Sequence, residues 1–546
     1  MIKKTSYLWI ATACYMLLSI AAYAQNDYPD NSQLRQRLQK LASQSSNASL
    51  QSLAKTEGNN DIWALTLSEG NADEKPAIAV FGGVAGHHLL GIDLAVRFAE
   101  DIVANNKELL KTTTFYVFPN MSPDASAQYF SQLKYNRQAN ASKTDDDRDG
   151  AVNEDPFEDL NGDGVITIMR IEDATGEYIS HPSDARILIK ADKQKGQKGK
   201  YKVISEGIDN DGDYQWNEDG PGGINFNKNM SFKFPYFESG AGEHPISEIE
   251  NRALLDFLYT KWNLYAIVSF GPQNNLSVPL KHNPAGTSKR VITSILKDDA
   301  KINQMISDQY NEATGFKGGK KNTGSGGDFF QWAYFHFGRL SLSTPGWWIP
   351  EMKIPKEDSV TVPNKDKNPE VNFLRWAEKE QLTNYFTEWT KVDHPDFPNK
   401  TVEVGGIHPY VMINPPYNLV EDISNKNNAF IYQLAAMQQN IRIVNVETKA
   451  TDKLLTRITA EIYNDGLLPT HTQMGDRSRW LRKIKVAIET GNDQVILSGK
   501  KIELIDRIDG DQSMTVSWLI KGKGTVKITA GAAHTGNDEI TVKLNN

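Results

Sequence analysis

Hydrophobic and polar positions alternate in blocks along the first three quarters of the chain. Short apolar runs at residues 62–67, 76–83 and 112–120 predict strands, and an amphipathic stretch at 92–106 predicts a helix between the last two. This strand–helix–strand order predicts a parallel sheet within an α/β domain. Further strands are predicted at 264–270 and 339–345, and further helices at 32–53, 246–259, 299–312 and 329–338.

The hydrophobic period changes to two after residue 440. Seven short runs, from IRIVNVETKA to EITVKL, alternate apolar and polar positions, with turn residues between them. Such a pattern is typical of a small all-β sandwich. We therefore divide the chain into a leader at 1–24, an α/β domain at 25–400 with an acidic insertion at 139–223, a linker with a short helix at 401–439, and a β-sandwich domain at 440–546.

The first 24 residues have the pattern of a secretory signal peptide. Lys3 and Lys4 precede an apolar run over residues 8–22, and the sequence AYA at 22–24 is a small-x-small cleavage site. An uncleaved anchor is the alternative. The only cysteine lies inside this leader, so the mature chain has no disulfide and no thiol nucleophile. No later window is apolar enough to cross a bilayer, so we expect a secreted or periplasmic protein without a transmembrane segment after cleavage.

The charge pattern argues against nucleic acid as a partner and predicts a bound cation. The formal net charge is −8, so the chain lacks the basic footprint of a nucleic-acid-binding protein. Acidic residues concentrate in the insertion, where a DxDxD pattern at 145–155 recurs at 209–219 and in shorter form at 159–166. Alternating carboxylates near a glycine offer oxygen ligands to a hard cation, so we expect structural calcium, although no EF-hand glutamate is present. The candidate calcium ligands are Asp145, Asp147, Asp149, Asp155, Asp159, Asn161, Asp163, Asp209, Asp211, Asp213 and Asp219.

Several landmarks in the α/β domain resemble the zinc carboxypeptidase (M14) family. The stretch GGVAGHHLLGIDLA stands where the family has G-x-H-G-x-E-x-x-G, and FPNMSPDASAQYF stands where it has its NPDG segment. GINFNKN stands for L-N-R-N, and GEHPISEIENRALLDFL matches the P-x-S-E-x-E-T helix start. The acidic insertion is similar to that of a large secreted subgroup. The resemblance covers about residues 65–380 and implies a mixed central sheet with helices on both faces.

In that family two histidines and a glutamate hold Zn²⁺ with one position open for water, and a second glutamate acts as general base. At the matching positions this chain has other residues. The two histidine positions hold Ala85 and Gly271, the zinc-binding glutamate position holds His88, and the general-base position holds Pro345. Ala, Gly and Pro have no ligating or basic side chain. The resemblance therefore implies a degenerate site in which zinc is absent.

The family's arginines bind the terminal carboxylate of the substrate. Asn227 matches the family's asparagine, whereas Lys228 replaces the neighbouring arginine and keeps its charge without the planar fork. Arg137 is the candidate for a second arginine, and the family's tyrosine falls near Asn322. These residues leave a possible cleft for a peptide C-terminus or another anionic ligand.

Three functions are consistent with this pattern. The first is a non-catalytic carboxypeptidase-like protein that binds peptides or acts as a scaffold. The second is an active metallohydrolase with relocated ligands, in which His88 joins His282, His336 or a remote carboxylate. His87 has no ligand role in the family pattern, and neighbouring turn residues rarely share one metal. The third is a glycan-binding surface protein, in which the aromatic pairs 347–348 and 332/334 would stack on sugars.

Overall fold

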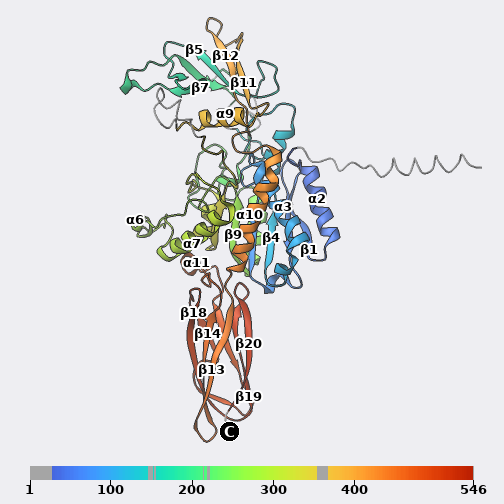
Figure 1. Ribbon diagram of the computed structural model, residues 1–546, viewed down its shortest axis with the longest axis vertical. Coiled ribbons are helices and arrows are strands. Elements are labelled where there is room, and N and C mark those ends of the chain that lie inside the picture. Colours follow the sequence, from blue (N-terminus) through green and yellow to red (C-terminus); the bar gives the residue numbers. More distant parts are fainter. Residues whose placement is uncertain are drawn as a thin grey trace, which may run out of the picture.

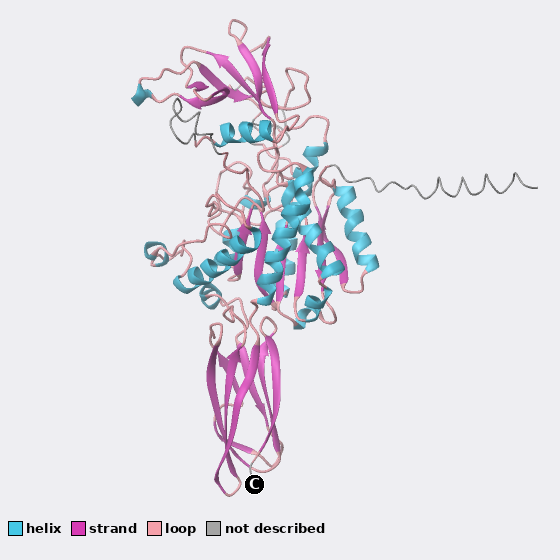
Figure 2. Ribbon diagram, in the orientation of Figure 1, coloured by secondary structure: helices cyan, strands magenta, loops and turns pink. Residues whose placement is uncertain are grey.

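The computed structural model describes residues 27–145, 150, 152, 155–212, 214–217, 222–352 and 367–544. The leader at 1–24 and the calcium candidates Asp147, Asp149, Asp213 and Asp219 lie outside these residues. Figures 1 and 2 show three parts along the long axis: a central sheet covered by helices, a second sheet at one end and a narrow all-β domain at the other.

The central sheet has the strand order β1-β2-β4-β3-β9-β10. Its parallel strands β3, β4, β9 and β10 are buried along their whole length, as expected for a sheet covered on both faces. Strands β1 and β2 add an antiparallel pair at one edge, so the sheet is mixed, as expected. The bounds are β1 (Ala48–Lys55), β2 (Asp61–Leu67), β3 (Ala77–Phe81), β4 (Thr114–Phe118), β9 (Leu264–Phe270) and β10 (Leu340–Thr344).

Helices cover both faces of this sheet, which confirms the predicted architecture. Ile78 and Val80 of β3 belong to one buried cluster with α3, α7 and α10, whereas Ala79 and Phe81 belong to another with α5 and α8. The two clusters follow from the alternation of side chains along a strand. The helices are α2 (Asn31–Gln44), α3 (Leu89–Asn105), α4 (Pro123–Ser126), α5 (Ile249–Thr260), α6 (Pro284–Thr287), α7 (Lys297–Thr314), α8 (Phe329–Phe335), α9 (Pro369–Lys379) and α10 (Val420–Ala436).

Two segments differ from the sequence pattern. The helix predicted at 32–53 ends at Gln44, because the residues after it pair with β2 as β1. Residues 401–439, expected to be a linker with a short helix, contain β12 and the 17-residue α10. Helix α10 lies against α3 and α7 and contributes Phe430, Ile431 and Leu434 to the core. Tertiary packing thus makes this segment part of the α/β body.

The second sheet is assembled from two distant parts of the chain. Its order is β11-β12-β5-β8-β6-β7, and β12 pairs antiparallel with β5 of the insertion. Helix α9 lies between this sheet and the central body in Figure 1, and its apolar side chains join the central core. The strands are β5 (Ile168–Glu172), β6 (Tyr178–His181), β7 (Asp184–Lys190), β8 (Tyr201–Ser205), β11 (Phe386–Val392) and β12 (Val402–Ile407).

The C-terminal domain is all-β, as predicted. Two four-stranded sheets, β13-β14-β18-β16 and β17-β15-β19-β20, pack around a core of Ile, Val and Trp518. The sequence pattern missed β16, whose four residues are largely exposed and therefore show no alternation. The elements are β13 (Ile441–Asp452), β14 (Leu455–Asn464), α11 (Gln473–Ser478), β15 (Ile484–Glu489), β16 (Val495–Ser498), β17 (Ile502–Ile505), β18 (Gln512–Lys521), β19 (Thr525–Ala532) and β20 (Gly536–Lys543).

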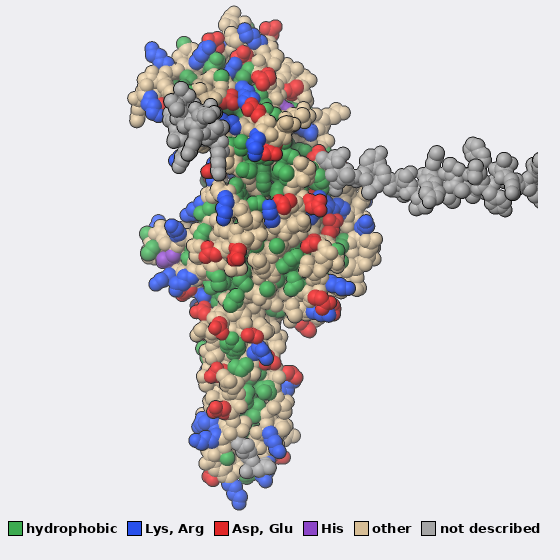
Figure 3. Space-filling model, viewed as in Figure 1, with side chains coloured by type: hydrophobic (Ala, Val, Ile, Leu, Met, Phe, Trp, Pro, Cys, Tyr) green, Lys and Arg blue, Asp and Glu red, His purple; other side chains and the backbone are tan. Residues whose placement is uncertain are grey.

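Charged side chains of both signs lie on the visible face of the molecule. Within the described ranges, no helix has both the length and the apolar character needed to cross a bilayer. Figure 3 shows acidic and basic side chains interspersed over the visible face of all three parts.

Candidate functional site

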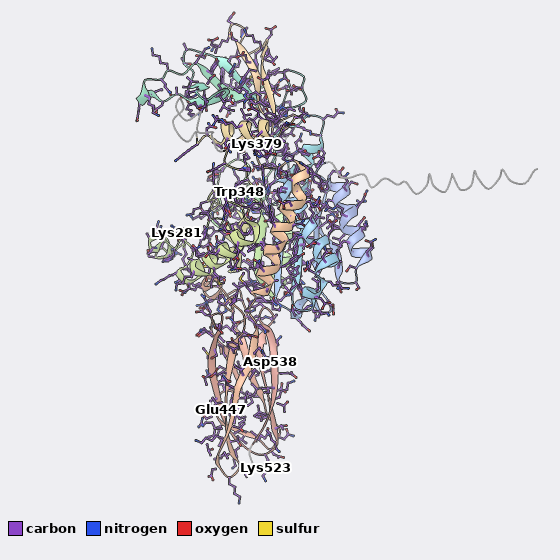
Figure 4. All side chains as sticks on the ribbon, in the orientation of Figure 1. Lys281, Trp348, Lys379, Glu447, Lys523 and Asp538 are labelled. Carbon is purple, nitrogen blue, oxygen red and sulfur yellow. The ribbon has the colours of Figure 1, made fainter. Side chains whose placement is uncertain are left out.

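The four positions matched to the zinc site lie together at the carboxyl ends of the parallel strands. Ala85 and His88 follow β3, Gly271 follows β9 and Pro345 follows β10. The Gly271 amide donates a hydrogen bond to the carbonyl of Thr344 at 3.0 Å, which joins the last two loops. Because β3, β9 and β10 are adjacent and parallel, their ends meet at one edge of the sheet, and this edge is where ligand sites form in open α/β sheets. Trp348 marks this edge in the upper part of the central body (Figure 4).

Position 271 has no space for a side chain. A Cβ built on Gly271 would lie 2.3 Å from Cγ2 of Val84, in the loop that also carries Ala85. Val84 is itself buried in the cluster beneath the sheet. Any larger residue at 271 therefore requires Val84 to move.

His88 is a buried, neutral histidine. Its side chain lies beside Gly91 and Phe270, and among the described residues neither ring nitrogen has a hydrogen-bond partner. Burial lowers the pKa of His88 to about 4, against the opposing effect of the Phe270 and Pro345 backbone. Burial, and then the neighbouring His88, likewise lower the pKa of His87 to about 4.

A distant loop holds this histidine turn in place. The Asn414 side chain accepts a hydrogen bond from the Leu90 amide at 3.0 Å and donates one to the His87 carbonyl at 2.9 Å. Leu90 lies in the first turn of α3, where backbone amides lack partners within the helix. Asn414 therefore supplies a hydrogen-bond acceptor to a backbone amide at the start of α3. The sequence pattern did not reveal this contact.

The predicted substrate-binding residues lie on two segments joined by an isolated bridge between Ala139 and Asn225. The Asn227 side chain accepts a hydrogen bond from the Phe329 amide at 2.9 Å. Lys228 Nζ donates to the Ser239 carbonyl at 3.1 Å, and Arg137 donates to the carbonyls of residues 139 and 140. Neither Lys228 nor Arg137 forms an ion pair with any described residue. Both cations therefore remain without a carboxylate partner.

A buried carboxylate cluster lies next to this bridge and was missed by the sequence analysis. Asn140 Nδ2 donates to Glu248 at 2.7 Å and to Glu250 at 2.8 Å. Asp124 accepts hydrogen bonds from Thr56 at 2.5 Å and from the Ala141 amide at 3.1 Å. Burial raises the pKa of Glu250 to about 7, and the nearby carboxylates Glu248 and Asp124 act in the same direction. The SEIE sequence was the available signal, because it places two acidic residues at the buried start of α5.

The acidic repeats share one local geometry. The first aspartate of each copy accepts a hydrogen bond from the amide five residues later: Gly150 to Asp145 at 3.0 Å, Gly164 to Asp159 at 2.6 Å, and Tyr214 to Asp209 at 3.1 Å. In the third copy, Asn161 Nδ2 contacts Asp163 at 3.2 Å. Asp211 also lies among the described residues.

Asp155 connects the first two copies. It is fully buried and accepts hydrogen bonds from the Asn210 amide and side chain at 3.0 and 3.1 Å, and from the Asn217 amide. Because both carboxylate oxygens are engaged by the protein, Asp155 has a clear structural role in holding the loops together.

Several residues named for the alternative functions make other contacts among the described residues. His282 Nδ1 contacts the Ile295 carbonyl and His336 Nδ1 contacts Ser231, each at 2.9 Å. Within the part of the chain that the structure describes, no three His, Asp or Glu side chains are grouped to hold a metal ion. The aromatic residues proposed to stack on sugars are also largely inside the molecule: Trp332, Tyr334 and Trp347 are buried.

The family model for zinc carboxypeptidases matches residues 34–363, more than half of the chain. The chain belongs to the zinc carboxypeptidase family. The match contains all four positions at the strand ends, as well as Arg137, Asn227 and Lys228. A separate model, a domain of unknown function (DUF8731), matches residues 440–543, which correspond to the β-sandwich. No curated protein matches the chain.

Solved structures of zinc carboxypeptidases are remote from this family member. Carboxypeptidase A from Helicoverpa armigera is 12% identical, with 62% of this chain and 70% of that chain covered and a TM-score of 0.37. Thrombin activatable fibrinolysis inhibitor is 10% identical, with 75% and 74% covered and a TM-score of 0.43. The family assignment therefore stands on the family model.

Proposed function

We propose that this zinc carboxypeptidase family member is a secreted or periplasmic protein that binds peptide C-termini or similar anionic groups without hydrolysing them. The proposal rests on the packing of Val84 against Gly271. Cγ2 of Val84 occupies the space where the side chain of a zinc-binding histidine at position 271 would begin.

The other residues at this edge do not fit a catalytic zinc ion. A catalytic site takes three protein ligands and leaves one position open for water. Ala85 and Gly271 offer no donor atom, so His88 is the single ligating side chain among the four matched positions. Pro345 cannot accept a proton from water. Hydrolysis would therefore lack both the metal-bound nucleophile and the base that activates it.

Binding is supported by the cations near the strand ends. Lys228 donates to one backbone carbonyl, and Arg137 donates to two carbonyls and hydrogen-bonds the Tyr135 side chain, so neither cation is paired with a carboxylate of the described residues. A carboxylate ligand would gain charge-assisted hydrogen bonds from both. Asn227, held by the Phe329 amide, would supply a neutral donor beside them.

Metal content and peptidase activity of the mature protein test this proposal together. We expect no zinc after dialysis and no release of C-terminal residues from peptides with added zinc. A peptide with a free C-terminus should bind more tightly than its C-terminal amide, and this preference should be lost in Lys228→Met. Stoichiometric zinc with chelator-sensitive hydrolysis would instead establish the alternative, an active enzyme with relocated ligands.

We also propose that the acidic loops bind structural calcium. The three copies share the same first-aspartate geometry, and the carboxylates that follow in each copy would repel one another without a cation.

A further inference from the structure

A cavity lies at the opposite end of the central sheet from the candidate site, where the central body meets the β-sandwich. Its wall includes Tyr265 from the start of β9, Arg339 from the turn before β10, and His471 and His534 from the C-terminal domain. The start of β9 is the amino end of the sheet, so this cavity is separate from the candidate site at the carboxyl ends. It leaves about 30 Å³ for the centres of water-sized molecules, more than the roughly 10–15 Å³ that one water needs.

Arg339 is a buried cation without an anionic partner. Its side chain is 5% exposed and it forms no ion pair with any residue that the structure describes. Nη1 donates to the carbonyls of Phe337 at 3.0 Å and Trp480 at 2.7 Å, whereas Nε has no hydrogen-bond partner. The guanidinium also lies 4.4 Å from the centre of the Phe337 ring. Burial lowers the pKa of Arg339 to about 10, which leaves it charged at neutral pH.

Three more polar atoms on the same wall, including His471 Nε2, lack hydrogen-bond partners among the described residues. His534 Nε2 and the Tyr265 hydroxyl are buried and make no hydrogen bond within the described chain. Burial, and then the nearby Arg339 and His471, lower the pKa of His534 to about 3, against the opposing effect of a hydrogen bond to the Thr470 backbone, so its ring is neutral. A buried donor without a partner destabilises the folded state, and a buried unpaired charge does so more strongly.

The acidic groups around the cavity are already engaged elsewhere. Asp299 accepts hydrogen bonds from the amides of Gln473 and Met474 and from Tyr334, and it lies 3.5 Å from Arg507. Asp476 lies 3.8 Å from His471 Nε2 and is exposed. Neither carboxylate pairs with Arg339.

We propose that this interdomain cavity binds one small anion, of the size of chloride or a short carboxylate, through Arg339 and Tyr265, with His534 on the facing wall. One negative charge would neutralise Arg339, and Nε and the Tyr265 hydroxyl would each donate to it. The wall comes from both domains, since His534 lies in the turn between β19 and β20. Figure 4 shows Asp538, just beyond this turn, toward the central body, and Lys523 at the far tip. The anion would therefore join the two domains.

Thermal unfolding with different anions tests the proposal. The purified mature chain is heated in sodium gluconate, and chloride, bromide or formate then replaces gluconate at constant ionic strength. Gluconate is too large for the cavity. A bound anion stabilises the folded state by mass action, so we expect the melting temperature to rise by about 2 °C or more with the small anions. The response should saturate and should disappear in Arg339→Met.

Arg442→Met is the matched control, because Arg442 is an exposed arginine of the C-terminal domain that pairs with Asp465. It should keep the wild-type response. If Arg339→Met does not fold, anomalous diffraction from bromide in wild-type crystals shows whether an anion occupies the cavity. Bromide next to Arg339 Nε supports the proposal. Water alone in the cavity, or equal melting temperatures in all anions, overturns it.

Discussion

One methyl group determines whether position 271 can carry a side chain. Cγ2 of Val84 occupies the space that a Cβ at 271 would fill. Gly271 and Val84 are therefore matched in size. A larger residue at 271 alone would clash with Val84, and a smaller residue at 84 alone would leave a void. At this scale, the residue at position 271 is coupled to the packing of Val84.

We expect Gly271→Ala to destabilise the protein by about 1–3 kcal/mol through overpacking. Combining it with Val84→Ala should recover much of that loss, giving a favourable coupling in a double-mutant cycle measured by urea unfolding. Gly491→Ala is the control, because a Cβ there meets only Gln494 at 3.8 Å. Additive effects of the first two substitutions would contradict the contact.

Glu250 should make stability depend on pH. Its pKa is about 7 in the folded protein and 4.5 without the fold. Because the folded pKa is raised, the stabilisation is fully present below about pH 4.5 and is lost as pH rises through 7. The free energy of unfolding should therefore fall from about pH 5 to about pH 8, with at most about 3 kcal/mol from this residue.

Glu250→Gln should flatten this fall, as measured by denaturant unfolding at several pH values. Some slope should remain, because burial also raises the pKa of Asp328 to about 7. Glu447→Gln, an exposed carboxylate on β13 labelled in Figure 4, should leave the profile unchanged. An identical slope for Glu250→Gln and wild type would rule out this role.

At the scale of elements, the insertion is a set of loops supported by a sheet. Asp155 and Asn210 join the first two acidic copies, and Thr387 of β11 donates to Asp163 of the third at 2.7 Å. Strands β11 and β12 come from beyond residue 380. The loops of the insertion are therefore held by chain segments far from them in the sequence. A cation bound by the loops should therefore stabilise the whole second sheet.

Calcium should raise the melting temperature of the mature protein by about 2–4 °C, and a chelator should reverse the rise. Asp209→Asn should weaken this response, because it removes one charge while its amide oxygen can still accept the Gly212 hydrogen bond. Asp192→Asn, in the connection between β7 and β8 and outside the repeats, serves as the control. A melting temperature that is insensitive to calcium would exclude the calcium sites.

At the scale of the whole molecule, Asp299 links the central body to the β-sandwich. It lies in α7, and its partners Gln473, Met474 and Arg507 all belong to the C-terminal domain. Removing one partner of a buried, paired carboxylate typically destabilises a protein by several kcal/mol. The two domains should therefore unfold as one cooperative unit.

We expect Asp299→Ala to separate the unfolding of the two domains into two calorimetric transitions. Asp308→Ala, on an exposed position of the same helix, should keep the wild-type profile. A single transition for Asp299→Ala would show that other contacts carry the coupling.

The strand and helix pattern could be predicted where the period was strong. The buried parallel strands and the alternating strands of the sandwich lie close to their predicted positions, because each buries a face with its own hydrophobic period. Strand β1 and helix α10 could not be placed correctly, since pairing with β2 and packing on α3 fixed their form. The convergence of the four site positions followed from strand order, but the Val84 contact did not.

The sequence by itself determined the α/β and all-β division, the family resemblance, and which residues stand at the four positions matched to the zinc site, because these depend on residue type and local period. Only the tertiary structure decided that His88 is buried and neutral, that Glu248, Glu250 and Asp124 form one cluster, and that Arg339 and His534 line one cavity between the two domains. These properties depend on burial and on contacts between residues far apart in the chain, which no local pattern records.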